Sequence, residues 1–453
     1  MMDMDLKEIF FKLKQNIFRP EAARFAVYWN KEKQMSDEQR HAISLERRKT
    51  LIRHAYYHTT FYRKKYDTAG MKPEDIKNDN DFEKIPPLTR EEIRSFLTDM
   101  IADNIPLSRL KETSTGGSSG IPLKAYHDKA AFTDIFTWGF LNDIGINIWD
   151  NVGYLFRYAP HRTHPILNRL QWYPTKRCFL DVSFFTDENC EHFYSECCSI
   201  APTYLCGYVG AVCQFASWMD HKGYSLPSLK AIWTTSAPIS QSQRLELQRI
   251  FNCKAYTQYG CCEVLWLAAE CNQQQGLHWY DTYRHLESVD ERLRPVSYGH
   301  YGEALVTDLL NFAFPLIRYR NGDRICLLDR KCTCGSQWPL MAPVRGRMTD
   351  NIYFPDGACI AGDFLTTLFD GDPEAVSSFQ VIQKKDFSLV INYIPTTDSS
   401  KSRVERICHN LSKNISEKVP VSCHAVDTIN HDRGKFRFII RESEQISNPD
   451  HIQ

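Results

Sequence analysis

The sequence has no excess of charge of either sign, because 55 Lys and Arg residues balance 55 Asp and Glu residues. This excludes the strong overall basic bias of proteins that bind nucleic acid or anionic membranes, although a local basic patch stays open. Cysteine is also scarce for a disulfide scaffold, since 16 residues in 453 fall well below the ~8–10% of such chains. No internal repeat or low-complexity tract is present.

A secretory signal and a membrane span are also missing. The first residues, MMDMDLKEIFFK, carry charge where a signal has its apolar core, so we expect a cytoplasmic protein whose cysteines are free or metal-bound. The longest uncharged run, residues 197–219, is long enough to cross a bilayer. It contains Pro202, Gly207 and Gly210, which favours a buried strand–helix segment over a membrane span.

The composition that is present is ordinary for a globular protein. Hydrophobic residues make up 43% and charged residues 24% of the chain, and the length suggests about two to four domains. Apolar spacing predicts helices over residues 1–60. Residues 85–90 mark a turn, and Thr89 with Glu92 three residues later predicts a capping box at the start of a new helix.

Strand-like and helical patterns alternate from residue 150 to residue 310, which indicates an α/β architecture. Paired strands are predicted at 302–307, 316–320 and 324–328. The last hundred residues predict a small α+β module, with strands at 379–383, 388–393 and 436–440 and a helix at 402–413.

A loop rich in glycine and hydroxyl residues, Thr115–Pro122, is the first candidate for chemistry. Its three glycines let the backbone bend and expose N–H groups, and its hydroxyls add donors, which suits phosphate oxygens. It is not a Walker loop, because no Gly-Lys-Ser/Thr follows. A flexible linker has the same composition and stays open.

Three further segments place aromatic, acidic or basic side chains beside a glycine. Tyr259–Glu263 offers a ring for a base and a carboxylate for a magnesium ion. Arg318–Asp323, followed by Arg345–Arg347, offers a carboxylate for ribose hydroxyls and guanidinium groups for phosphate. Arg433–Arg437 is a basic turn near the C-terminus. An ordinary turn, a surface hairpin and a solvated basic turn are the respective alternatives.

In order and spacing, these four segments resemble motifs of the adenylate-forming superfamily of acyl-CoA synthetases. They resemble most the phenylacetate–CoA ligase branch, including its capsule-biosynthesis-associated members, over roughly residues 45–440. The matching elements are the phosphate loop (Thr115–Pro122), Tyr-Gly-x-Ser/Thr-Glu (Tyr259–Glu263), Tyr/Arg-x-Gly-Asp (Arg320–Asp323), the Gly-Arg-x-x-Asp hinge (Gly346–Asp350), the late Gly-Lys (Gly434-Lys435), Phe61-Tyr62-Arg63 and Ile85–Arg90.

The resemblance implies an adenylation site. Glu263 would bind Mg²⁺, Asp323 would take the ribose hydroxyls, and Lys435 would bridge the carboxylate and the α-phosphate. A carboxylate that attacks a phosphate is an encounter of two anions, so a metal ion and a lysine are needed to neutralise charge. The other implied ATP-binding residues are Thr115, Gly116, Gly117, Ser118, Ser119, Gly120, Ser236, Ala237, Pro238, Tyr259 (stacked on adenine), Gly260 and Arg347.

Three positions depart from the family pattern, and one region is hard to interpret. Cys262 replaces the usual hydroxyl before the glutamate, Thr257 replaces an acidic or amide residue, and Ala237 replaces a glutamate in Gly-Glu-Pro. Four aromatic residues lie where the family builds its acyl pocket, although core packing explains them equally well. They are Trp138, Phe140, Tyr158 and Tyr208.

A four-residue metal set is suggested by Cys271, His278, Cys332 and Cys334. Three thiols and an imidazole suit a tetrahedral structural zinc ion. Spacing alone leaves free thiols open, because Cys-x-Cys is not the common zinc knuckle. The resemblance favours zinc, since the segments around these residues look like zinc-binding elements of phenylacetate–CoA ligase relatives.

We therefore expect an α/β enzyme with a large multi-sheet ATP- and acid-binding domain (1–348) and a small mobile α+β C-terminal cap (349–453), hinged near Asp350. The resemblance implies ATP, Mg²⁺ and structural Zn²⁺, a small-molecule carboxylic acid, and coenzyme A as acceptor. An amide- or ester-forming ligase that uses an amine or sugar, and a non-catalytic nucleotide-binding homologue, stay open. No nucleic acid partner is expected, and a homodimer is possible.

Overall fold

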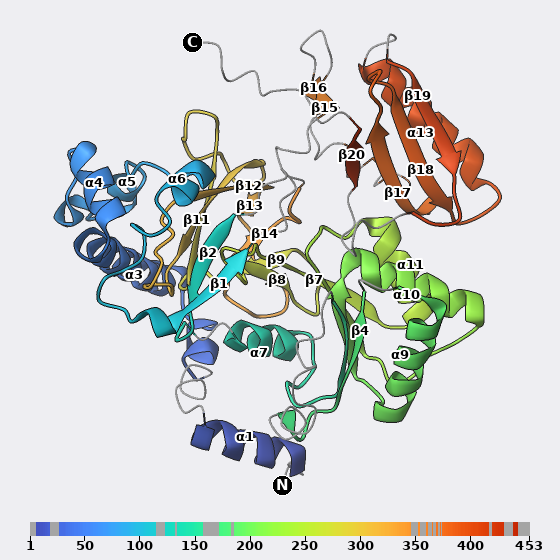
Figure 1. Cartoon of the computed structure of the whole chain (residues 1–453), viewed down its shortest axis with the longest axis horizontal. Coiled ribbons are helices and arrows are strands. Elements are labelled where there is room, and N and C mark those ends of the chain that lie inside the picture. The colour runs from blue at the N-terminus through green and yellow to red at the C-terminus, as the bar shows by residue number, and fades with distance from the viewer. Residues whose placement is uncertain are drawn as a thin grey trace. The chain divides into compact units, whose positions relative to one another are not determined.

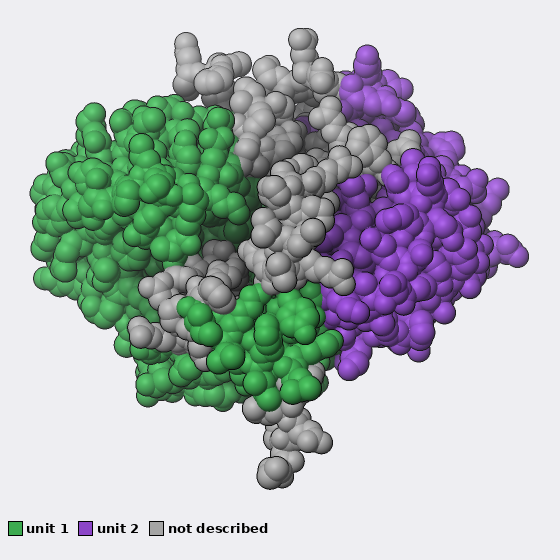
Figure 2. Space-filling model, turned by 60° about the horizontal axis from the view of Figure 1, so that its bottom comes forward, with its two compact units in different colours: residues 1–150, 170–175, 256–344 green, residues 151–169, 176–255, 345–453 purple. Residues whose placement is uncertain are grey.

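The computed structural model divides the chain into two compact units (Figure 2). Unit 1 comprises residues 1–150, 170–175 and 256–344, and unit 2 comprises residues 151–169, 176–255 and 345–453. The structure describes residues 6–18, 27–114, 123–131, 134–156, 172–182, 185–345, 352–353, 359–360, 365, 368–369, 372, 374–415, 419–429 and 438–442. The expected domain boundary at 348 stays a prediction, because residues 346–351 lie outside this set.

Unit 1 begins with helices, as expected from apolar spacing. They are α1 (Leu6–Phe18), α3 (Asp37–His58), α4 (Thr60–Thr68), α5 (Asp79–Phe82), α6 (Arg90–Ser95) and α7 (Asp134–Asp143), with 3₁₀ turns η1 (Pro73–Asp75) and η2 (Leu107–Arg109). The predicted capping box starts α6: the Thr89 hydroxyl accepts from the Glu92 N–H, and the Glu92 carboxylate accepts from the Thr89 N–H.

The strands of unit 1 pair antiparallel (Figure 1). Many of their buried apolar side chains belong to one core cluster. β1 (Leu110–Ser114) pairs with β2 (Lys124–Asp128), and β10 (Arg284–Val289), β11 (Gly302–Asp308) and β12 (Tyr319–Ile325) form a three-stranded sheet. A further antiparallel set runs in the order β13 (Leu327–Leu328), β14 (Leu340–Met341), β9 (Leu277–Trp279), β8 (Ala268–Glu270) and β7 (Lys254–Tyr259).

Unit 2 contains a parallel sheet in the order β6 (Ala231–Thr235), β5 (Tyr204–Tyr208), β3 (Val152–Phe156) and β4 (Arg177–Asp181). Helix α9 (Asp187–Ile200) contacts β4, and α10 (Val209–Lys222) contacts β5 and β6. α11 (Gln241–Phe251) packs on α10. Helices between parallel strands cover the sheet, which explains the nearly continuous apolar sequences of β5 and β6.

The uncharged run 197–219 forms the end of α9, strand β5 and most of α10, which confirms the expected strand–helix segment. Among the described residues, none of the helices combines the length and apolarity that crossing a membrane requires.

The C-terminal part of unit 2 is a four-stranded sheet with one helix. β17 (Val376–Gln383) pairs antiparallel with β18 (Leu389–Pro395) and parallel with β20 (Ile439–Arg441), while β19 (Val421–Ala425) pairs parallel with β18. The sheet and α13 (Ser400–Ile415) enclose their own apolar core. A short hairpin of β15 (Ile352–Tyr353) and β16 (Cys359–Ile360) precedes them.

Two strand predictions need correction. The separate strands expected at 316–320 and 324–328 are one strand, β12, which continues through the Asn-Gly pair as a bulge and is followed by the short β13. Strand β19 was missed because it is short and none of its five residues is buried, so it lacks an apolar run. The other predicted elements of the C-terminal module are present, with their ends shifted by a few residues.

Candidate active site and metal centre

A tight turn after β7 carries Glu263. The Cys261 N–H donates to the Val264 carbonyl at 3.0 Å, and the Val264 N–H donates to the Cys261 sulfur at 3.4 Å. A Cβ atom at Gly260 would lie 2.9 Å from the Trp266 backbone nitrogen, which is closer than real Cβ contacts. Glycine is therefore required where the chain turns to present the carboxylate.

Glu263 is buried, with 1% of its surface exposed, and among the described residues only its Oε1 atom is hydrogen-bonded. Oε1 accepts a hydrogen bond of 2.7 Å from the Tyr319 hydroxyl, and Arg90 Nη2 lies 3.9 Å from Oε1. Burial, more than the nearby carboxylate, raises the pKa of Tyr319, so its phenol stays protonated and donates. Among the described residues, Oε2 has no hydrogen-bond partner. A buried carboxylate oxygen that accepts no hydrogen bond is suited to bind a cation.

A second buried carboxylate, Asp323, is held by the side chains of Tyr259 and Asn321. Asp323 Oδ2 accepts from the Tyr259 hydroxyl at 3.0 Å and from Asn321 Nδ2 at 2.9 Å. Asn321 Nδ2 also lies 2.8 Å from the Tyr259 hydroxyl, and Asn321 Oδ1 accepts from the Asp323 N–H. The network fixes the carboxylate, as recognition of a ligand hydroxyl requires.

The bulge in β12 explains how these residues reach Tyr259. Glu303 pairs with Arg324 and Leu305 pairs with Arg320, so β12 has two more residues than β11 across this interval. The extra length contains Gly322, whose φ of 83° favours glycine. Bulges of this kind re-aim side chains beside functional sites.

The segment 85–90 docks beside β12 and brings Arg90 to Glu263. The Leu88 N–H donates to the Arg318 carbonyl, and the Arg320 N–H donates to the Leu88 carbonyl. The buried Arg318 guanidinium forms a bidentate ion pair with Glu287 at 2.9–3.1 Å. It also donates to the carbonyls of residues 83 and 85. Arg90 is fixed in turn by a 2.8 Å bond to the carbonyl of residue 321.

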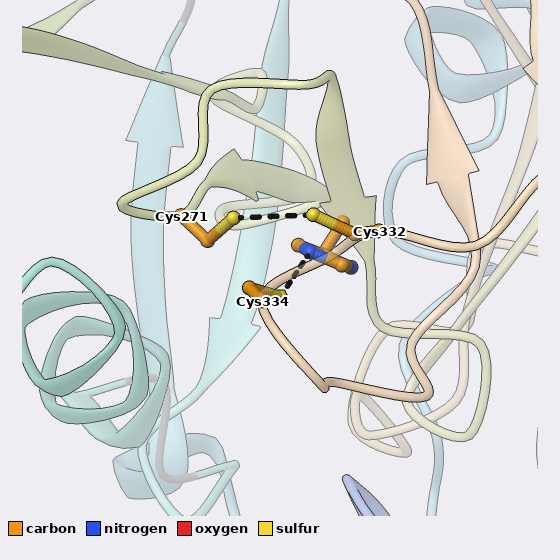
Figure 3. Close-up of side chains that lie close together, drawn as sticks. Cys271, Cys332 and Cys334 are labelled. Atoms are coloured by element: carbon orange, nitrogen blue, oxygen red, sulfur yellow. Dashed lines mark hydrogen bonds between the residues drawn. The ribbon is translucent and has the colours of Figure 1, made fainter.

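The structure brings the four predicted metal ligands together (Figure 3). The ligand atoms of Cys271, His278, Cys332 and Cys334 all lie within 4.8 Å of one another. The Cys271 and Cys332 sulfurs are 3.6 Å apart, and the Cys334 sulfur lies 3.3 Å from His278 Nε2. A tetrahedral ion with Zn–S bonds of ~2.3 Å would place two sulfurs about 3.8 Å apart, which is close to this spacing.

The surroundings orient the imidazole toward the thiols. His278 Nδ1 donates to the Trp338 carbonyl at 2.9 Å, which leaves the lone pair of Nε2 toward Cys334. Burial lowers the pKa of His278 to about 4, so the ring is neutral near pH 7 and able to coordinate a metal. Burial also raises the pKa of Cys271 to about 12, so this thiol is protonated unless a cation displaces its proton.

The remaining predicted ATP and acyl residues are only partly described. Thr115, Gly116, Gly117, Ser118, Ser119, Gly120, Tyr158, Arg347, Asp350 and Lys435 lie outside the described residues. In unit 2, Ser236, Ala237 and Pro238 directly follow β6. Ser236 has a φ of 80°, which is uncommon for a non-glycine residue.

Three of the four proposed acyl-pocket residues can be placed. In unit 1, Trp138 lies on α7 against Phe11, with ring centroids 5.5 Å apart, and Phe140 is buried against Trp266. In unit 2, Tyr208 ends β5 and is half-buried. Their role in an acyl pocket stays a prediction.

Sequence reasoning missed four residues that support the site. Arg90, Tyr319 and Asn321 lay inside segments already singled out, yet only pairing across the fold reveals their contacts with Glu263 and Asp323. Nothing in the sequence indicated a role for His127. Its Nε2 lies 2.7 Å from the Cys262 carbonyl and donates to it, which supports the turn that carries Glu263.

Known proteins resemble this chain in both sequence and structure. The CapK C-terminal domain family matches residues 352–442. The phenylacetate-coenzyme A ligase of Thermus thermophilus is 23% identical over 370 residues, which cover 78% of this chain and 80% of that protein. The phenylacetate-coenzyme A ligase of Escherichia coli K12 is 25% identical over 309 residues, which cover 63% of this chain and 67% of that protein.

Among solved structures, 2-hydroxyisobutyryl-CoA ligase in its postadenylation state matches with a TM-score of 0.75 and 17% identity, covering 92% of each chain. Identity at this level shows the shared α/β fold. The sequence relatives and the C-terminal family match support a more specific assignment, to a family. Together, these similarities support the adenylate-forming superfamily and its phenylacetate–CoA ligase branch as the family of this chain.

Proposed function

We propose that the protein is an ATP-dependent ligase that adenylates a carboxylic acid and then transfers the acyl group to coenzyme A. In the first step, the carboxylate attacks the α-phosphorus of ATP, and the bond to pyrophosphate breaks. In the second, the thiolate of coenzyme A attacks the acyl carbon, and AMP leaves. The observation that carries this proposal is the buried Glu263, which has one oxygen held by Tyr319 and the other without a partner among the described residues.

The side chains around Glu263 and Asp323 fit the parts of a magnesium nucleotide. Glu263 Oε2 would hold the cation, and Tyr319 keeps the carboxylate in place by its bond to Oε1. When bound, Mg²⁺ supplies charge neutralisation for the phosphate oxygens. Asp323, fixed by Tyr259 and Asn321, would accept bonds from the ribose hydroxyls. Tyr259 is proposed to border the adenine.

Pyrophosphate exchange tests the first step. Purified protein is incubated with a panel of carboxylic acids, ATP, labelled pyrophosphate and Mg²⁺. We expect label to enter ATP only with a cognate acid and only when Mg²⁺ is present. ADP and phosphate as products would contradict adenylation. Adding coenzyme A or an amine to the same reaction and identifying the product by mass spectrometry then decides the acceptor.

Removing the hydroxyl that holds Glu263 should weaken the cation site. We expect Tyr319→Phe to raise the Mg²⁺ concentration for half-maximal exchange by about tenfold, the scale of one lost hydrogen bond to a charged group. Tyr66→Phe is the matched control, because the buried Tyr66 hydroxyl has no hydrogen-bond partner among the described residues. Equal Mg²⁺ requirements in the wild type and both variants would show that Tyr319 does not position Glu263.

We also propose that Cys271, His278, Cys332 and Cys334 hold one structural zinc ion. The support is the convergence of three thiols and an oriented imidazole, whose ligand atoms lie within 4.8 Å of one another. Four protein ligands fill a tetrahedral shell and leave no position for a substrate, so the ion would tie residues 271–278 to residues 332–334 without a catalytic role.

Loss of one thiol should release the zinc ion and destabilise the fold. We expect Cys334→Ser to lose the metal and to lower the unfolding temperature by about 5–10 °C, while pyrophosphate exchange at 25 °C continues. Metal analysis after dialysis and thermal unfolding measure both effects. Cys253→Ser removes a partly buried thiol outside the set and should keep the zinc ion. A wild-type protein that is stable without zinc would refute the site.

A further inference from the structure

One side chain of strand β2 reaches the turn that carries Glu263. His127 is buried, and its Nε2 donates to the Cys262 carbonyl at 2.7 Å. The two residues are 135 positions apart in the chain, so this bond joins two separate elements of unit 1. Because a peptide group is planar, a hydrogen bond that fixes the Cys262 carbonyl also fixes the backbone nitrogen of Glu263. The bond therefore acts on the peptide directly before the proposed cation ligand.

The residues on either side of His127 are anchored by other contacts. Asn311 Nδ2 donates to the Tyr126 carbonyl at 2.8 Å. The carboxylate of Asp128 accepts two hydrogen bonds from the Arg109 guanidinium. The strand is also paired with β1 along its whole length. Since these contacts place β2 without His127, the bond to the turn extends from a fixed strand to the loop that carries the carboxylate.

A second buried donor holds the far end of the turn. Arg284 Nε donates to the Trp266 carbonyl at 3.1 Å, and Arg284 Nη1 pairs with Asp308 at 2.5 Å. Trp266 has a φ of 50°, an uncommon conformation for a non-glycine residue, which persists where the surroundings hold it. Glu263 therefore lies between two backbone carbonyls that are both fixed by buried side chains, one by His127 and one by Arg284.

We propose that His127 is a positioning residue that sets the place of the Glu263 carboxylate for the cation of a magnesium nucleotide, a role that rests on the proposed function. Tyr319 holds only Oε1, at the tip of a flexible side chain, so the place of Oε2 also depends on the backbone from which that side chain starts. Groups that bind a ligand must be held to within about 0.5 Å. His127 contacts neither the cation nor the nucleotide in this role and acts through Glu263.

The imidazole donates this bond as a neutral ring. Burial, more than the charges of Asp308, Arg284 and Lys111, lowers the pKa of His127, so the ring is uncharged near pH 7 and Nε2 carries its proton. A glutamine amide is also an uncharged donor, and its nitrogen is as many bonds from the backbone as Nε2. An asparagine amide is one bond shorter. The two amides therefore form a matched pair of replacements, of which only glutamine can reach the carbonyl.

Binding of ATP to the full chain without any acid tests the proposal in the absence of turnover. Titration calorimetry gives the dissociation constant of ATP with and without Mg²⁺. His127→Phe keeps a ring and removes the donor, and we expect it and His127→Asn to weaken binding of Mg²⁺–ATP by about tenfold. His127→Gln should stay within about twofold of the wild type. Binding of ATP without Mg²⁺ should be alike in every protein. If the phenylalanine variant fails to fold, the asparagine and glutamine variants decide the question.

A double-mutant cycle shows whether His127 acts through Glu263. In a Glu263→Gln background, which lacks the cation ligand, His127→Phe should cause no further loss of Mg²⁺–ATP binding. His54→Phe is the matched control, because the half-buried His54 ring donates from Nε2 to the Phe312 carbonyl at 2.9 Å in the same unit. This variant should bind Mg²⁺–ATP as the wild type does. Thermal unfolding checks that each variant is folded at the assay temperature.

The outcomes separate the role of His127 from the proposed function. If Mg²⁺–ATP binding falls in Glu263→Gln but not in His127→Phe, the positioning role is overturned and the proposed function stands. Independent losses that add in the double variant, or an equal loss in His54→Phe, would show that His127 only stabilises the fold and would also overturn the role. A wild type that binds ATP no better with Mg²⁺ than without it would contradict the proposed function, and the positioning role with it.

Discussion

Replacing Glu263 with glutamine is expected to lower acid-dependent pyrophosphate exchange by about 10³, the scale of several kcal/mol of lost metal assistance. Glutamine keeps the volume of the side chain, and its carbonyl still accepts the Tyr319 hydroxyl. The negative charge is lost, and the amide NH₂, which cannot bind a cation, takes the place of Oε2, which has no partner among the described residues. The loss should therefore appear as a failure to use Mg²⁺, with the fold retained.

Glu303→Gln is the matched control for the loss of a carboxylate. Glu303 is a largely buried glutamate of the same unit, and its carboxylate pairs with Arg320. This variant should exchange pyrophosphate near the wild-type rate. Thermal unfolding of both variants checks whether either has a folding defect. If Glu263→Gln exchanged near the wild-type rate at low Mg²⁺, the buried carboxylate would be structural, and the cation site would lie elsewhere.

The sequence predicted those parts of the fold that depend on neighbours in the chain. The capping box of Thr89 and Glu92 is present because both partners lie within one turn. Ser240 and Gln243 form a capping box at the start of α11 in the same way, again between residues three apart in the chain. The buried strands β3 and β5 carry apolar runs that only a covered parallel sheet accommodates.

The contacts that shape the site depend on long-range pairing and could not be predicted in the same way. Tyr319 and Glu263 are 56 residues apart, and nothing local indicates that the phenol holds one oxygen of the carboxylate. An Asn-Gly pair usually signals a turn, so β12 was divided in two. In the structure, pairing with β11 on both sides keeps the strand continuous, and the bulge presents Asn321 and Asp323 to Tyr259.

The metal ligands are an intermediate case. Their spacing left free thiols open, and the resemblance of the surrounding segments to zinc-binding elements of phenylacetate–CoA ligase relatives indicated the grouping, although 63 residues separate Cys271 from Cys334 (334 − 271 = 63). The Trp338 carbonyl that orients His278 had no sequence signal, because a backbone acceptor is available at every position.

Replacing Lys435 with alanine is expected to reduce the first half-reaction by roughly 10²–10³, the scale for one preorganised charge partner. Lys435 lies outside the described residues, so this prediction depends on the late Gly-Lys motif and on the match of residues 352–442 to the CapK C-terminal domain. In the proposed cycle, the C-terminal module brings this ammonium group to the carboxylate and the α-phosphate. We propose that after adenylation the module turns near Asp350 and carries the ammonium group away.

The two half-reactions should therefore separate in the Lys435→Ala variant. Pyrophosphate exchange reports adenylation, and release of AMP from pre-made acyl-adenylate and coenzyme A reports transfer, which should continue near the wild-type rate. Lys384→Ala is the matched control, because Lys384 lies in the same module and forms an exposed 2.6 Å ion pair with Glu442. An exposed pair contributes little, so this variant should keep both activities. Equal losses of adenylation and transfer in Lys435→Ala would show that Lys435 acts structurally and that the module does not alternate between two positions.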